Sequence, residues 1–412
     1  MASTKASAGS GAATDAEIDS STSRIYESIL RLNDWLEKND YRGYDTFDGL
    51  NARFLRPFTF ESELLRTVLQ QGVRRFPVNL RPLVGIAKSH SSKGMGYLAR
   101  GFLRLYQCTG DETWKNKAEF ALGWLLKHRS SGYHGSCWGN HFDYQSRSFY
   151  LPKGMPTVVW TSLIGHAFLD AYDEFQKKQY LETAVGACEH ILHALDLCPD
   201  GDGTCISYIP GMKCLVHNAN TLGGSLLART YLHTRNDEYL NLARKSMHYT
   251  MKYQRADGSW WYGEKENLHW VDNFHTAYVL DCLKCYREST GDDSFAEGTM
   301  RGYRYWKSTF FLRDGTPKYY NYKVLPIDIQ CCSQAIDTLV FFSRWDDDAI
   351  PLAMKVAQWT IEYMQDRNGH FYYRRYSPWL VNRTPTLHWG QATMLSALGG
   401  LYRELTNEAR LA

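Results

Sequence analysis

The sequence predicts an all-α fold, an (α/α)6 toroid in which six helical hairpins close into a ring. Turns with Asp-Gly or Asn-Gly recur around Gly201, Gly258, Gly315 and Gly369, at steps of 57, 57 and 54 residues. The stretches between these turns place apolar residues three and four positions apart, the spacing of amphipathic helices and not of strands. A repeat of this length fits one unit of two helices and a loop.

Six such units follow one another along the chain, and the first five are complete helix pairs. The first helices of the units are expected to begin near Gly94, Thr157, Ala219, Asn273, Cys331 and His388. They are rich in Gly, Ala, Ser and Cys, as expected where helices crowd around an axis, whereas the second helices carry more charge and suit an outer ring. The last unit has no second helix before Ala412. We expect a helix at 24–38 to take that place and to close the ring by pairing with the helix at 388–404.

Composition and charge limit the classes of function. We expect a disordered tail over residues 1–22, which are small and polar, and a single toroid domain over 23–412. The net charge is +3, so neither nucleic acid nor an anionic membrane is favoured as a partner. No run is long and apolar enough to be an integral membrane segment. Ten scattered cysteines, two of them adjacent (Cys331 and Cys332), indicate reduced thiols in a cytoplasmic protein.

Aromatic residues make up 14% of the chain, including 28 Tyr and 13 Trp. A large helical core accounts for some of them. A sugar-binding cleft is the functional explanation, because apolar sugar faces stack on aromatic rings while Tyr and Trp bond hydroxyl groups.

The loops that enter the inner helices should all emerge at one end of the toroid, beside the positive N-termini of those helices. We expect the catalytic residues at this mouth to be Asp272, His275, Asp328, Asp143 and Tyr144. The residues expected to bind substrate are Trp138, His141, Tyr208, His217, His269, Trp270, Arg383, His388, Trp389, Asp45 and Arg53. Convergence of so many loops on one concavity favours a functional site over a purely structural ring.

Several residues have simpler interpretations. Asp272 and Asp328 each precede an inner helix and could serve only as N-caps. His134, Cys137 and His141 have the spacing of half a zinc site, but the sequence offers no compact second half. It also has no phosphate-binding loop, dinucleotide fingerprint or nucleophile elbow. We therefore expect neither a metal nor a cofactor.

Segments spread over residues 40–400 carry a resemblance to a known family. They include GYDTFDGLNARFLRP, SCWGNHFDYQSR, VHNANTLGGSLLAR and VDNFHTAYVL. They resemble an uncharacterised bacterial and archaeal family whose members are often described as polysaccharide biosynthesis proteins of the VpsJ type. The resemblance implies the fold of the six-hairpin glycosidases, which include unsaturated glucuronyl hydrolases. VDNFHT is similar to the segment with the catalytic Asp of those hydrolases, so the resemblance gives that role to Asp272.

The leading hypothesis is an enzyme that acts on a uronate-containing or otherwise acidic glycan, during polysaccharide biosynthesis or modification, by hydrolase-like acid/base chemistry. Its partner would be an oligo- or polysaccharide substrate. C5 epimerisation of a uronyl residue is the alternative within this class, because Tyr and His can supply a base and an acid on opposite ring faces. A terpenoid or lanthionine cyclase on the same toroid and a non-catalytic glycan-binding protein also stay open.

Overall fold

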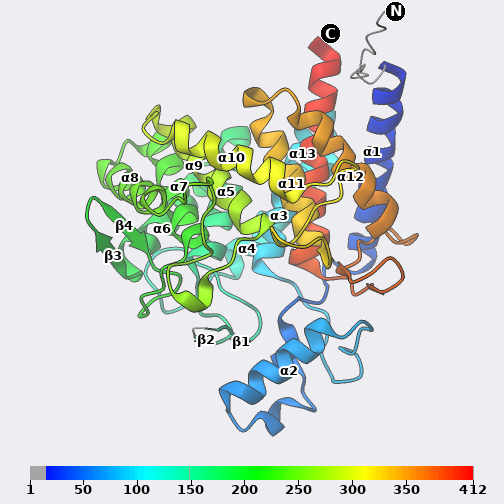
Figure 1. The fold of residues 1–412 in the computed structure, drawn as a ribbon, viewed down its shortest axis with the longest axis horizontal. Helices are drawn as coiled ribbons and strands as arrows, with labels where there is room; N and C mark the ends of the chain where they lie inside the picture. Colours follow the sequence, from blue (N-terminus) through cyan, green and yellow to red (C-terminus); the bar gives the residue numbers. More distant parts are fainter. Residues whose placement is uncertain (1–14, 148, 412) are drawn as a thin grey trace, which may run out of the picture.

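The computed structural model of the chain describes residues 15–147 and 149–411, and thirteen α-helices carry the fold of this part (Figure 1). The predicted all-α toroid is confirmed. The inner helices are α3 (Ser92–Thr109), α5 (Val158–Phe175), α7 (His217–Thr234), α9 (Asn273–Thr290), α11 (Ile329–Phe342) and α13 (Thr393–Leu411). Each inner helix contacts the next, and α13 contacts α3, so the ring is closed. Their first residues lie within two positions of the expected starts, except that the π-helical turn Leu387–Ala392 precedes α13.

The outer ring completes the hairpins. It consists of α4 (Glu112–Lys127), α6 (Lys178–Ala194), α8 (Asp237–Lys252), α10 (Ala296–Phe310), α12 (Ala349–Met364) and α1 (Asp15–Lys38). Helix α1 packs antiparallel to α13, as predicted, and the rings of Tyr26 and Tyr402 stack with their centroids 4.7 Å apart (Figure 1). The helix begins at Asp15, so residues 15–22, expected in the tail, form its first turns. The rest of the expected tail, residues 1–14, lies outside the described residues.

The repeated turns join each unit to the next outer helix. Gly258, Gly315 and Gly369 have φ angles of 94°, 89° and 98°, which L side chains rarely adopt. A Cβ atom on them would lie 2.8 Å from the carbonyl oxygen of Arg301 in α10, 2.7 Å from the carbonyl carbon of Lys355 in α12, and 2.0 Å from the carbonyl oxygen of Arg31 in α1. The same contact that joins consecutive units therefore also joins the last turn to α1.

Short strands stiffen the loops at one end of the ring. β1 (Tyr144–Gln145) pairs with β2 (Tyr150–Leu151), and β3 (Leu197–Asp200) pairs with β4 (Gly203–Ile206), both antiparallel. β5 (Ile327–Asp328), β6 (Arg374–Arg375) and β7 (Val381–Asn382) form a three-stranded antiparallel sheet in that order.

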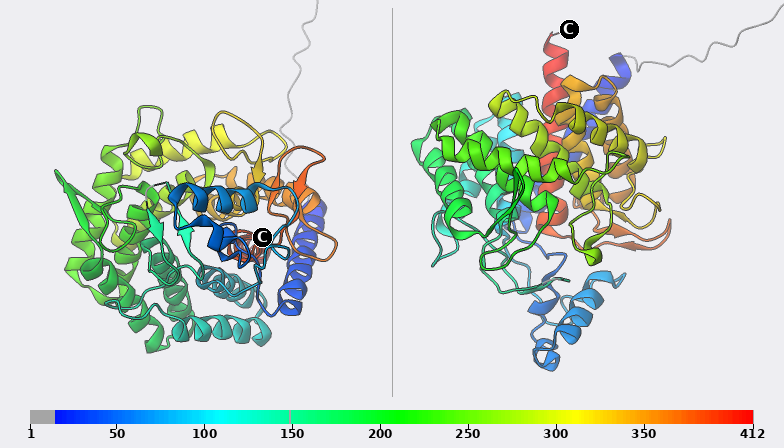
Figure 2. Two further views of the ribbon diagram at one scale, coloured as in Figure 1. Left: turned by 90° about the horizontal axis from the view of Figure 1, so that it is seen from below. Right: turned by 60° about the vertical axis from the view of Figure 1, so that its left-hand side comes forward.

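Helix α2 (Glu63–Arg75) was not predicted, and it lies across the same end of the ring (Figures 1 and 2). Its inward face is polar, with Thr67, Gln71 and Arg74 lining the cavity described below. Leu64 and Val68 point outward, 70% and 60% exposed. The helix also packs Val73 and Leu69 against Tyr44 and Ile86, so it presents a polar side to the cavity and an apolar side to the neighbouring loop.

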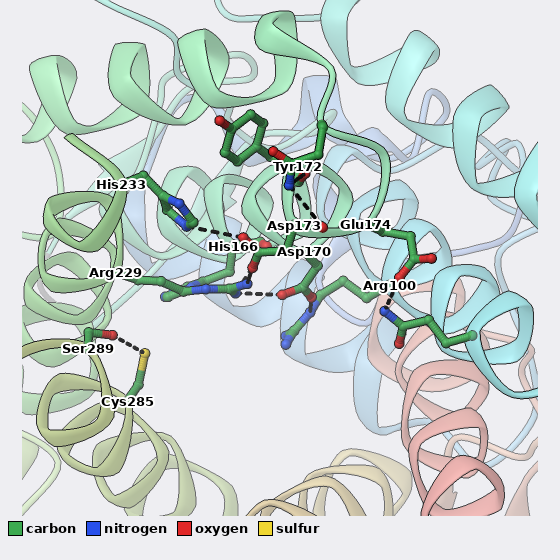
Figure 3. A network of polar contacts seen from close by, with 12 residues as sticks. Arg100, His166, Asp170, Tyr172, Asp173, Glu174, Arg229, His233, Cys285 and Ser289 are labelled. Atoms are coloured by element: carbon green, nitrogen blue, oxygen red, sulfur yellow. Dashed lines mark hydrogen bonds and ion pairs between the residues drawn. The ribbon is translucent and has the colours of Figure 1, made fainter.

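The opposite end of the ring is tied together by ion pairs (Figure 3). Asp170 of α5 accepts hydrogen bonds from Arg100 of α3 at 2.7 Å and from Arg229 of α7 at 2.5 Å. Burial alone would raise the pKa of Asp170, but the two guanidinium groups outweigh burial and hold its pKa far below its usual range. Arg229 also pairs with Asp173 at 2.7 Å. This network fixes three neighbouring inner helices at the end away from α2.

All ten cysteines are free thiols, and eight of them are buried. Among the described helices, none combines the length and apolar character that a membrane crossing requires.

Candidate active site

A cavity of about 1010 Å³ opens at the mouth of the ring, between the N-terminal ends of the inner helices and α2. Its walls are largely aromatic. The Phe, Tyr and Trp rings that line it are those of Phe47, Phe142, Tyr144, Phe149, Trp160, Tyr208, Tyr262, Trp270, Phe274, Tyr278, Tyr319, Tyr320, Tyr376 and Trp389. Tyr262 and Trp270 stack with centroids 4.5 Å apart, which creates a flat apolar surface of the kind that accepts a sugar ring.

The charged side chains that line this cavity are mostly cationic. They are Arg74, Arg75, Lys93, Arg147, Lys323 and Arg374, against the single carboxylate of Glu63. Low-dielectric walls that carry one sign of charge concentrate ligands of the opposite sign. The cavity therefore favours an anionic ligand.

At the start of helix α9, the carboxylate of Asp272 is hydrogen-bonded to the imidazole of His275. Asp272 is the N-cap residue, and its Oδ1 accepts the backbone N–H of His275 at 3.0 Å. Its Oδ2 accepts from His275 Nδ1 at 2.7 Å and from Trp270 Nε1 at 2.8 Å. The Asp272 side chain is buried, whereas His275 lines the cavity. Asp272 thus orients the imidazole and does not itself face the cavity.

A second pair of this kind lies at the start of the last inner helix. His388 Nδ1 bonds Oδ2 of Asp45, and both side chains are buried. Burial alone would raise the pKa of Asp45, but the neighbouring His388 imidazole outweighs burial and lowers it. Arg81 fixes the turn that carries Asp45, because it donates to the Asp45 carbonyl at 2.7 Å and to Asp48 Oδ1 at 2.8 Å.

Both histidines therefore use Nδ1 for a carboxylate, so that Nε2 is left for a ligand. His388 lines the cavity, and its Nε2 is a buried atom without a hydrogen-bond partner among the described residues. An imidazole whose Nδ1–H is held by a carboxylate can accept a proton at Nε2 and return it, the role of a general base and acid. The cavity thus has two candidate proton-transfer groups.

The structure brings six of the predicted site residues to the cavity. These are Tyr144 and His275 from the predicted catalytic set, and Tyr208, Trp270, His388 and Trp389 from the predicted substrate-binding set.

The other predicted catalytic carboxylates have partners elsewhere. Asp143 faces Arg56 at 3.5 Å and accepts the backbone N–H of Lys153, outside the cavity lining. Asp328 is fully buried, where Arg374 donates to its Oδ2 at 2.6 and 2.8 Å. Trp389 Nε1 donates to its Oδ1 at 2.7 Å. Asp328 also caps α11.

The remaining predicted substrate-binding residues do not line the cavity. Trp138 is in the core, where its Nε1 donates to the Leu125 carbonyl. His217 bonds Glu264 at 2.6 Å, and His269 stacks on Trp261. The others off the lining are His141, which is half-buried, the buried Asp45, and Arg53 and Arg383, which are exposed.

Sequence reasoning missed Lys93, which lies in the first turn of α3 and is only 4% exposed. Burial lowers its pKa to about 8, although Asp45 acts in the opposite direction. One feature of the sequence could have indicated that Lys93 is a functional residue. A cation at a helix N-terminus opposes the helix dipole, and Lys93 stands among small residues at such a position.

Among the described residues, only His134, Glu189 and His193 gather three candidate metal-ligand atoms within 4.8 Å. Glu189 and His193 belong to the outer helix α6, and none of the three lines the cavity. The predicted absence of a metal or cofactor stays a prediction.

No protein-family model matches the chain, and no curated protein matches it in sequence. Its structure is similar to cellobiose 2-epimerase from Bacillus thermoamylovorans, with a TM-score of 0.57 and 11% identity over 75% of this chain and 87% of that one. A polysaccharide lyase gives a TM-score of 0.59 and 12% identity over 93% and 98%. The GH76 α-mannanase of Bacteroides thetaiotaomicron gives 0.57 and 14% over 79% and 88%. At these identities the likeness shows the fold alone, a toroid of α-helical hairpins.

Proposed function

We propose that this protein is an enzyme that modifies a uronate-containing glycan by moving the proton at C5 of a uronyl residue, a C5 epimerisation. The observation that carries the proposal is the pair of cavity histidines, His275 and His388, each held at Nδ1 by a buried aspartate. Epimerisation needs one group that removes a proton and another that returns one to the opposite face. The cationic lining supports an acidic substrate.

The proposed reaction conserves all atoms of the glycan. Nε2 of one histidine takes the C5 proton, and the electron pair of the C–H bond passes into the carboxylate to give an enediolate. The lining cations stabilise the added negative charge, because electrostatic stabilisation is strong in a site shielded from water. The second imidazole, protonated at Nε2, then donates its proton to C5 from the other side.

Similar structures include both an epimerase and hydrolases, so the proposal depends on the site residues when it departs from the leading hypothesis from the sequence, hydrolysis. Hydrolysis needs two carboxyl groups beside the scissile bond, about 5–9.5 Å apart. Asp272 and Asp328 already accept three or more hydrogen bonds each, and Glu63 is the only carboxylate among the lining residues. Asp272 keeps a proposed role in which it positions His275. The family resemblance is consistent with a reaction in polysaccharide biosynthesis.

The test is incubation of the protein with hexuronate oligosaccharides in heavy water, followed by mass spectrometry, with neutral oligosaccharides of equal length as the control. We expect one deuterium per modified uronyl residue and no change in chain length. Cleavage with addition of water and without exchange would support hydrolysis instead. Cleavage to an unsaturated product would retain the proton abstraction but replace epimerisation by elimination.

A further inference from the structure

The floor of the cavity contains a lysine without a counter-ion. Lys93 is 4% exposed and lines the cavity, and in the part of the chain that the structure describes it makes neither a hydrogen bond nor an ion pair. Its Nζ lies over aromatic rings, 4.9 Å from the centroid of Trp160 and 5.8 Å from that of Tyr278. Burying an ammonium group that has no anionic partner costs several kcal/mol, so this charge needs a partner from outside the chain.

The nearest carboxylate does not supply that partner. Asp45 acts on Lys93 through space, but its oxygens are engaged by His388 Nδ1 and by the backbone N–H of Phe47. The other titratable groups around Lys93 are His388, which stands beside Trp160, and Tyr97 and Tyr278, whose rings lie near Nζ and whose hydroxyl groups bond each other at 2.6 Å. Neither tyrosine carries a negative charge at neutral pH, because burial raises the pKa of both.

The polar atoms around this floor have free hydrogen-bonding capacity. Trp160 Nε1 and the Oδ1 atoms of Asn140 and Asn218 are buried and have no partner among the described residues, and all three side chains line the cavity. Buried polar groups are almost always satisfied, so these unsatisfied atoms in the lining of one cavity indicate a polar ligand, and the unpaired ammonium of Lys93 indicates that this ligand is anionic. The indole N–H of Trp160 can donate to a carboxylate oxygen, whereas the two Asn Oδ1 atoms accept hydrogen bonds and suit hydroxyl groups of the same sugar residue.

We infer that Lys93 and Trp160 form the subsite that binds the carboxylate of the uronyl residue, while Asn140 and Asn218 of the same cavity accept hydrogen bonds from sugar hydroxyl groups. The inference rests on the proposed function for the identity of the anion. It makes Lys93 the residue that distinguishes an acidic sugar from the neutral sugar of the same shape. An ammonium at this place also stabilises the charge that the carboxylate gains when the C5 proton leaves.

The experiment is a calorimetric titration at pH 7 with a hexuronate trisaccharide and with the same trisaccharide after reduction of its carboxyl groups. The wild-type protein should bind the acidic form at least ~10-fold more tightly, since a buried charge-assisted hydrogen bond contributes about 1.5–3 kcal/mol. Lys93→Met should bind both forms with similar, weak affinity. Lys178→Met, which removes an exposed lysine of the outer helix α6 that does not line the cavity, should keep the preference.

Three outcomes are decisive. Equal binding of the two forms by the wild-type protein, or a preference that survives in Lys93→Met, overturns the subsite. Tighter binding of a sulfated neutral trisaccharide than of the hexuronate assigns the subsite to another anion and also overturns it. Binding that depends on the carboxyl group and on Lys93, without exchange or turnover in heavy water, keeps the subsite and removes the proposed reaction.

Discussion

Asp272 Oδ2 lies 2.7 Å from Nδ1 of His275, while Oδ1 of the same carboxylate accepts the backbone N–H of His275 at 3.0 Å. One buried side chain therefore caps helix α9 and also orients an imidazole toward the cavity. These two roles can be separated by substitution.

We expect Asp272→Asn to lower kcat by ~10²–10⁴ with little change in melting temperature. Asn can still cap the helix, but it no longer stabilises the imidazolium or fixes the productive tautomer. Asp272→Ala should lose activity and, in addition, about 0.5–2 kcal/mol of stability. Paired measurements of turnover and thermal unfolding test this, and an Asn variant with wild-type turnover would remove Asp272 from the mechanism.

Lys93 should destabilise the empty protein at neutral pH. Its pKa is about 8 in the folded chain and about 10.4 in the unfolded chain. This difference corresponds to about 3 kcal/mol in the free energy of unfolding. On a rise in pH, the folded state loses this proton at a lower pH than the unfolded state does. The loss of folding stability caused by the charged lysine is therefore complete below pH 8 and disappears as the pH rises toward 10.4. We expect Lys93→Met to unfold at a higher temperature than wild type at pH 7, with a gap that closes near pH 10.

Thermal unfolding of both proteins across this pH range is the measurement. The groups around Lys93, namely Asp45, His388, Tyr97 and Tyr278, are the same in both proteins, so their titration largely cancels in the difference. A Met variant less stable than wild type at pH 7 would contradict the buried, unpaired state of this ammonium.

Gly369 should be essential for closure of the ring. Gly369→Ala combines a φ of 98° with a Cβ atom 2.0 Å from the Arg31 carbonyl oxygen, so we expect a loss of more than ~2 kcal/mol. Gly201→Ala is the matched control, because Gly201 also has a positive φ, 60°, but no atom within 4 Å of the added Cβ. Urea unfolding of the two variants should differ clearly, and equal losses would mean that the contact with α1 does not matter.

Asp328 should behave as a structural residue. Asp328→Asn leaves Arg374 buried without its anion, and breaking such a pair typically costs about 3–5 kcal/mol. We expect a marked fall in melting temperature for this variant, in contrast to Asp272→Asn. A variant with normal stability and no activity would instead return Asp328 to the candidate catalysts.

The ring could be predicted from the sequence because each of its parts has a local signal. Gly258, Gly315 and Gly369 recur with the helix pairs since each must approach the backbone of the next outer helix. The inner helices likewise begin at residues such as Asp272 that cap them. Helix α2 gave no such signal, because it leaves Leu64 and Val68 exposed and its pattern matches no repeat.

The site was predictable only in part. His275 and His388, both expected at the mouth, line the cavity, and their roles there stay predictions. The sequence could not tell which carboxylates face a ligand, since Asp328 is neutralised by Arg374, 46 residues away in sequence. Lys93 was missed because the sequence does not show which buried charges lack a partner. Its significance depends on the lack of a partner, and only the packing of neighbouring helices reveals that.

The most direct test of the central claim is proton exchange at C5 in heavy water, catalysed by His275→Gln and by His388→Gln, starting from each pure epimer of a hexuronate oligosaccharide. If the two imidazoles serve opposite faces, each variant should exchange the C5 proton of one epimer only, and neither should invert it. Nuclear magnetic resonance of the C5 signal gives both readouts. Inversion at the wild-type rate by either variant, or hydrolysis by the wild-type protein without any exchange, would contradict the account.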